Sequence, residues 1–157
     1  MGEFGLRVAI LGLGNLLLGD EGFGVHALRY LEGEIPPDVA LIDGGTRGLY
    51  LYPFLEGVTH LIILDVVRLR RPPGTVITLG REELNGAIVP KISAHDVALP
   101  DLLALLEMGG GGPRDIRLVG VVPGEFGARV GLSEEVRAAL PKVKEEVLSI
   151  LRQWGVM

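Results

Sequence analysis

The feature of this sequence that most constrains its fold is the alternation of short apolar runs with segments of helical periodicity. Runs of this kind, rich in Val, Ile and Leu, are typical of buried strands that crossover helices join into a largely parallel sheet. We therefore predict five strands, at Val8 to Leu13, Val39 to Ile42, Leu61 to Leu64, Thr75 to Leu79 and Ile116 to Val122.

One connection is too short for a parallel crossover. Only nine residues separate Asp65 from Thr75, and they include Pro72-Pro73-Gly74. A parallel connection needs about a dozen residues or more, so we expect the fourth strand to run antiparallel to the third. The predicted fold class is α/β, a three-layer sandwich with a central mixed, mostly parallel five-stranded sheet flanked by helices.

The end of the chain reads as helical. Ser133 is placed to cap a helix that has Glu134 and Glu135 in its first turn, where carboxylates suit the helix dipole. We expect Pro141 to interrupt this helix and to begin a last one, which runs through Trp154.

Composition excludes several functions. The 157 residues match a single domain, 1–157, with a formal net charge of −5 and no basic cluster beyond Arg68, Arg70 and Arg71, so we expect no nucleic acid partner. The absence of cysteine removes disulfides, zinc-thiolate sites and cysteine nucleophiles. No apolar run reaches the length of a membrane span and no leader precedes Val8, so we expect a cytoplasmic protein without a membrane partner.

The stretch from Gly12 to Gly24, G-L-G-N-L-L-L-G-D-E-G-F-G, should form the loop that follows the first strand. Its glycines allow sharp turns and a close approach to a partner, and Asp20 and Glu21 supply carboxylates. The stretch begins like a dinucleotide-binding motif but has Leu17 where the third glycine is needed, which argues against nucleotide binding. We interpret Asp20 as a capping or turn residue.

Each of the first three strands delivers an acid to the same predicted edge of the sheet. Glu21 follows the first strand, Asp43 ends the second and Asp65 ends the third. Ligands of doubly wound sheets bind outside the carboxyl ends of the strands, so we expect these three carboxylates to crowd one crevice. Crowded carboxylates resist ionisation unless they share a cation or a proton, and a metal ion is the simplest resolution.

The chain offers three histidines as further ligands. His60 begins the third strand, roughly 16 Å from Asp65 in extended chain, and is excluded from this crevice. His26 we interpret as a helix-surface residue, whereas His95 lies on a connection that could reach the crevice. A set of Glu, Asp and His suits nickel, zinc or similar ions and does not distinguish them.

Five ordered motifs carry a family resemblance. They are G-x-G-N-x-L-x-x-D-E-x-x-G from Gly12, D-G-G-T from Asp43, L-I-I-x-D from Leu61, K-I-S-x-H from Lys91 and L-V-G-V-x-P from Leu118. In this order the motifs resemble those of the hydrogenase maturation endopeptidases, and the similarity spans Val8 to roughly Trp154.

The resemblance implies what the residues alone do not. It implies a nickel-dependent endopeptidase that removes the C-terminal extension of a nickel-iron hydrogenase large-subunit precursor after nickel insertion. Glu21, Asp65 and His95 occupy the positions of the family's nickel ligands, and we expect the substrate to supply the nickel, with no other cofactor. Asp43 is the candidate catalytic helper, although a turn aspartate at a strand end is an equal alternative. We expect a monomer.

A second hypothesis assigns the same crevice to a protein that does not hydrolyse peptide bonds. The same residues could serve a non-enzymatic maturation chaperone that binds nickel or inspects the precursor. Stoichiometry separates the two, because an enzyme processes many precursor molecules per chain and a chaperone does not.

Overall fold

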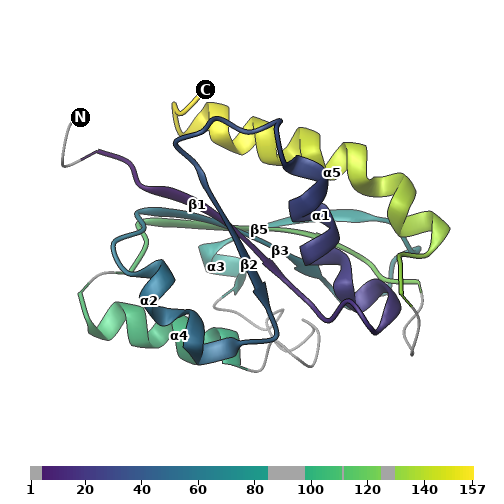
Figure 1. Cartoon of the computed structure of the whole chain (residues 1–157), viewed down its shortest axis with the longest axis horizontal. Helices are drawn as coiled ribbons and strands as arrows, with labels where there is room; N and C mark the ends of the chain where they lie inside the picture. Colours follow the sequence, from purple (N-terminus) through teal and green to yellow (C-terminus); the bar gives the residue numbers. More distant parts are fainter. Residues whose placement is uncertain (1–4, 85–97, 111, 125–129) are drawn as a thin grey trace.

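Five strands form one sheet in the order β2-β1-β3-β5-β4 in the computed structural model, which describes residues 5–84, 98–110, 112–124 and 130–157 (Figure 1). The strands are β1 (Val8–Leu13), β2 (Ala40–Gly45), β3 (His60–Val66), β4 (Val76–Gly80) and β5 (Asp115–Val121). All five lie within a few residues of the predicted runs. The largest difference is at β2, which extends to Gly45, so Asp43 lies inside the strand.

Strand directions confirm the mixed sheet. β1 is parallel to both β2 and β3, and β3 is parallel to β5. β4 pairs antiparallel with β5, and it therefore runs against β3, as its short connection to β3 predicts.

Helices cover both faces of the sheet and complete the predicted three layers. In Figure 1, α1 and α5 lie over one face, and α2 and α4 lie over the other. The helical segments are η2 (Gly19–Gly22), α1 (Phe23–Leu31), η3 (Gly48–Leu51), α2 (Tyr52–Leu55), α3 (Arg81–Leu84), α4 (Ala98–Met108) and α5 (Glu134–Gln153). None of those in the described part of the chain is long and apolar enough to span a membrane.

Alternate residues of the central strands divide the core in two. In β3, Ile62 and Leu64 pack beneath α1 and α5, while Leu61 and Ile63 pack against η3, α2 and α4. All four side chains are fully buried, as expected for a parallel strand covered on both faces. This alternation fixes the face to which any further side chain on these strands belongs.

The last helix corrects one prediction. Ser133 caps α5 as expected, because its hydroxyl accepts a hydrogen bond from the Val136 amide at 3.4 Å. The expected break at Pro141 is wrong, since α5 is a single helix of 20 residues, Glu134–Gln153, with Pro141 inside it. Proline in a helix interior costs about 3 kcal/mol, but buried Val136 and Val143 pack on the sheet to either side of it, and this continuous stripe holds the helix together.

The parallel strands define two edges. We call the side where β1, β2, β3 and β5 end the carboxyl edge, and the side where they begin the amino edge. The stretch from Gly12 to Gly24, which we call the site loop, and the segments that leave β3 and β5 all lie at the carboxyl edge. The predicted site is therefore to be sought there.

Candidate functional site at the carboxyl edge

The glycines of the site loop serve close packing of the protein on itself. A Cβ at Gly24 would lie 2.1 Å from the Leu13 carbonyl oxygen and 2.2 Å from that of Leu64. One at Gly12 would lie 2.4 Å from the Gly24 oxygen. The start of α1 thus packs directly on the backbones of β1 and β3, and this contact fixes the position of the preceding acids. The close approach expected for a partner is made here by the chain's own backbone.

The loop is also closed by hydrogen bonds. The Gly14 amide donates to the Gly45 carbonyl of β2 at 2.9 Å, and the Asn15 amide donates to the Glu21 carbonyl at 3.1 Å. Gly14 has a φ of +143°, a conformation that side chains rarely adopt. The loop is therefore held at both of its ends.

Asp20 is buried and holds together distant parts of the chain. Its carboxylate accepts hydrogen bonds from the Gly124 amide at 2.8 Å, the Ser133 amide at 2.7 Å and the Ser133 hydroxyl at 2.8 Å. The prediction of a capping or turn residue describes only its local position. Asp20 ties the site loop to the residue that caps α5, a role for which the sequence holds no local signal.

Glu21 is buried and paired with a cation. Its side chain is 8% exposed, and its Oε2 lies 2.9 Å from a guanidinium nitrogen of Arg68, whose side chain is 47% exposed. Arg68 lies two residues after the last residue of β3, so this ion pair brings the loop after β1 against the end of β3. We did not predict this contact, although Arg68 stands only three residues after Asp65 in the sequence.

Asp65 is fully buried near the end of β3, where it pairs in register with Gly120 of β5. Its Oδ1 accepts a hydrogen bond from the Val66 amide at 2.7 Å. Glu21 and Asp65 are thus both buried carboxylates at the carboxyl edge, as predicted. A buried carboxylate requires charge compensation, and Arg68 supplies one positive charge beside Glu21.

Asp43 lies apart from the two buried carboxylates. It is exposed, it sits on β2 and it pairs in register with Gly12 of β1, so β1 separates it from β3. Alternation places its side chain on the α1 face, because its neighbour Gly44 faces Leu51. The guanidinium of Arg47 donates to the Asp43 carbonyl. The structure therefore does not bring three carboxylates together in one crevice.

The histidines differ in their relation to the site. His95, the third predicted ligand, lies outside the described residues. His60 begins β3 at the amino edge and is far from the site, as predicted. Among the residues that the structure describes, no three His, Asp or Glu side chains form a group that could hold a metal ion. The set Glu21, Asp65 and His95 consequently stays a prediction.

His26 is less exposed than a helix-surface residue. Its Nε2 is buried and has no hydrogen-bond partner in the described part of the chain. Burial lowers the pKa of His26, and the positive charges of Arg29 and Arg137 lower it further, against the opposing effect of Asp20. At neutral pH this imidazole is uncharged.

A family model described as hydrogenase maturation protease matches residues 25–150. The hydrogenase 2 maturation protease of Escherichia coli K12 is 38% identical over 154 residues, which cover 96% of this chain and 94% of the relative. The hydrogenase expression/formation protein HupD of Rhodobacter capsulatus is 36% identical, with 96% of this chain and 73% of the relative covered.

Solved structures give the same result. The hydrogenase maturating endopeptidase HybD from E. coli superposes with a TM-score of 0.86 at 36% identity, over 96% of this chain and 94% of that chain. The NiFe hydrogenase maturation protease HybD from Thermococcus kodakarensis superposes with a TM-score of 0.77 at 30% identity, over 92% of this chain and 99% of that chain.

Proposed function

Because this chain belongs to the hydrogenase maturation protease family, we propose that it removes the C-terminal extension of a nickel-iron hydrogenase large-subunit precursor once nickel has been inserted. The family is one of endopeptidases, so peptide-bond hydrolysis is the reaction to explain. The observation that carries the proposal is the pair of buried carboxylates, Glu21 and Asp65, at the edge of the sheet where α/β proteins bind ligands.

In this proposal the precursor's own nickel is the recognition signal. Glu21, Asp65 and His95 engage it, and these oxygen and nitrogen donors fit nickel or similar divalent ions. The scissile bond is then fixed against the carboxyl edge, and precursor without nickel is not held in register. Nickel thereby acts as part of the substrate.

The ion pair of Glu21 with Arg68 supports this role. A buried carboxylate without a cation nearby is unfavourable, and Arg68 supplies that charge while no precursor is bound. Nickel binding would exchange the guanidinium for a metal ion at the same carboxylate. Since the Arg68 side chain is 47% exposed, its head group can turn into solvent without disturbing the core.

Two routes to hydrolysis fit these residues. Nickel can polarise the scissile carbonyl, or water can be activated by the metal or by a carboxylate. Asp43 is our candidate helper, because it is exposed at the carboxyl edge next to the site loop. There it would orient water or accept a hydrogen bond from the peptide backbone.

Intact-mass analysis of a large-subunit precursor tests the proposal. The precursor is prepared with and without nickel, and each form is incubated with catalytic amounts of the protein. We expect the nickel-loaded form alone to lose one C-terminal fragment, with many turnovers per chain. Loss from both forms would keep the protease and reject recognition of nickel. Loss from neither form, with stoichiometric binding in a pull-down, would favour the chaperone alternative.

A further inference from the structure

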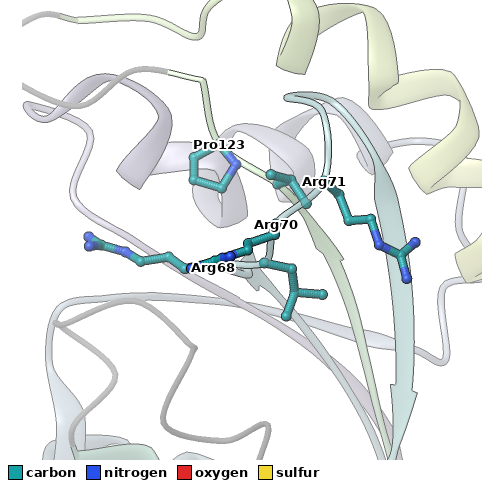
Figure 2. Close-up of a pocket in the computed structure, with 6 residues that line it drawn as sticks. Arg68, Arg70, Arg71 and Pro123 are labelled. Atoms are coloured by element: carbon teal, nitrogen blue, oxygen red, sulfur yellow. The ribbon is translucent and has the colours of Figure 1, made fainter.

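A pocket lined largely by arginine lies beside the proposed site. It has a volume of about 400 Å³ and opens where the chain leaves β3 and β5. Its lining residues, which we call the arginine pocket, are Arg68, Leu69, Arg70, Arg71, Val122 and Pro123. Figure 2 shows the three arginines and Pro123 around the pocket, with the Arg71 guanidinium on a different side from Arg68.

The pocket concentrates positive charge on an acidic protein. The chain carries a formal net charge of −5, yet three arginines stand within four consecutive residues here, and all three are exposed. Arg68 pairs with Glu21, whereas Arg70 and Arg71 form no ion pair with any residue that the structure describes. Two guanidinium groups are therefore available to an anion from outside.

The backbone that carries these arginines is fixed. The Val67 amide donates to the Val121 carbonyl at 2.9 Å, the Arg71 amide to the Leu69 carbonyl at 2.9 Å and the Gly74 amide to the Val122 carbonyl at 2.8 Å. The first and the last of these bonds join the segment after β3 to the end of β5, and the second forms a turn within the segment. An anion that binds here meets side chains on an ordered support, which reduces the entropy lost on binding.

We propose that the arginine pocket binds the carboxylates of an acidic segment of the precursor polypeptide. This inference rests on the proposed function and adds a second contact for the same substrate. Guanidinium groups match carboxylates in bidentate geometry, and the apolar atoms of Leu69, Val122 and Pro123 suit the carbon stems of Glu and Asp side chains. Among the lining residues that the structure describes, none is an aromatic residue on which a base could stack, which argues against single-stranded nucleic acid.

Arg68 links this pocket to the proposed site. Its guanidinium contacts Glu21 while its side chain lines the pocket, so the two lie within one side chain of each other. Because Arg68 belongs to both places, engagement of nickel at Glu21 is expected to affect binding of the acidic segment in the pocket.

Direct binding tests the pocket without any catalysis. The probe is a fluorescently labelled hexaglutamate peptide, followed by anisotropy at low salt. The Arg70→Gln/Arg71→Gln double variant is compared with Arg29→Gln/Arg152→Gln, which removes the same charge from exposed positions on α1 and the last turn of α5. We expect the first variant to bind roughly tenfold more weakly and the second to bind like the wild type, given ordinary strengths of exposed ion pairs.

Three results would overturn the pocket assignment. The first is no binding by the wild-type protein, and the second is equal weakening in both double variants, which would indicate only bulk charge. The third is binding of a labelled six-nucleotide oligothymidylate in preference to the peptide.

Kinetics on the precursor separate this inference from the proposed function. With nickel-loaded precursor, we expect Arg70→Gln/Arg71→Gln to raise KM about tenfold and to leave kcat unchanged, an effect that added salt removes. An unchanged KM would overturn the pocket while the protease stands. If the wild-type protein processes no precursor, the proposed function fails, and the peptide-binding assay still decides whether the pocket binds carboxylates.

Discussion

At the amino edge of the sheet, the carboxylate of Asp115 accepts hydrogen bonds from the Trp154 indole at 2.8 Å and from Arg117 at 3.2 and 3.3 Å. At the carboxyl edge, the Glu21 side chain is far more deeply buried, yet it forms an ion pair with the half-exposed Arg68. Acids thus occur at both edges, but their surroundings differ.

The contacts of the amino edge join its residues to one another. The rings of Trp154 and His60 pack edge to face, with 4.9 Å between their centres. The Arg117 guanidinium lies 5.8 Å from the centre of the Trp154 ring. These groups fasten the end of α5 to the starts of β3 and β5. The carboxyl edge instead combines buried carboxylates with exposed guanidinium groups, an arrangement that can exchange its internal partners for a ligand.

Replacing one aspartate at each edge should separate activity from stability. We expect Asp65→Asn to reduce processing of nickel-loaded precursor at least about 100-fold, because it removes a proposed metal ligand. The fold should persist, since an amide oxygen can still accept the Val66 amide hydrogen bond. Asp115→Asn serves as the matched control and should process precursor normally. A variant of Asp65 that unfolds would assign that residue a structural role.

Asp20→Asn should cause the largest loss of stability. The amide cannot accept all the hydrogen bonds that the carboxylate receives from Gly124 and Ser133, and a buried donor is left unsatisfied. We expect the free energy of unfolding to fall by about 3 kcal/mol in a urea titration. Asp38→Asn, at an exposed position, should change it by less than about 0.5 kcal/mol. Equal stability of the two variants would contradict the role given to Asp20.

Trp154→Phe tests whether the amino edge is purely structural. The substitution keeps a ring against His60 but removes the indole hydrogen bond to Asp115. We expect a loss of about 1 kcal/mol in the free energy of unfolding and no change in kcat or KM for precursor. A changed KM would show that this edge also contacts the substrate.

As the pH falls, protonation of His60 should be the first event at the amino edge that lowers the stability of the fold. Burial lowers the pKa of His60, although Asp115 raises it and Arg114 lowers it further, so the folded protein binds a proton less readily than the unfolded chain does. Stability due to the neutral imidazole is full above its ordinary pKa of 6.5 and is lost as the pH falls toward the lowered value. His60→Asn should therefore flatten the decline of melting temperature between pH 7 and 5. An unaltered slope would contradict this origin.

Asp115 should cause a second loss of stability, at a lower pH than His60. Burial opposes its ionisation, but hydrogen bonds from Trp154 and Arg117 outweigh that effect and hold the pKa of this carboxyl below its ordinary 3.8. Its contribution to stability is present above pH 3.8 and disappears as the pH falls through the depressed value. Asp115→Asn should remove only this lower part of the profile.

Much of the fold could be read from the sequence because its determinants are local. Apolar runs mark the strands, and the short connection that contains Pro72-Pro73-Gly74 sets the direction of β4. The continuity of α5 could not be read in this way. The interruption expected at Pro141 is outweighed by packing against a sheet whose position no local pattern reveals.

The candidate site likewise combines features with local determinants, which the sequence predicts, and features that depend on distant residues, which it does not. Glu21 and Asp65 were expected at one edge because each follows or ends a strand. The separation of Asp43 from them depends on its strand continuing to Gly45, which decides the face on which the side chain lies. The partners of Glu21 and Asp20 are 47 and up to 113 residues away in the chain, so sequence spacing carries no trace of either contact.

The hydrogen bonds from Ser133 to Asp20 can form only late in the synthesis of the chain. The ribosome delivers the glycine-rich loop early, but the donors that secure its acid belong to a turn made more than a hundred residues later. During synthesis the loop that carries Glu21 is therefore held in place only after the C-terminal quarter of the chain has been made. A prematurely terminated product that lacks Ser133 also lacks these hydrogen bonds, and with them the contact that joins the loop to the start of α5.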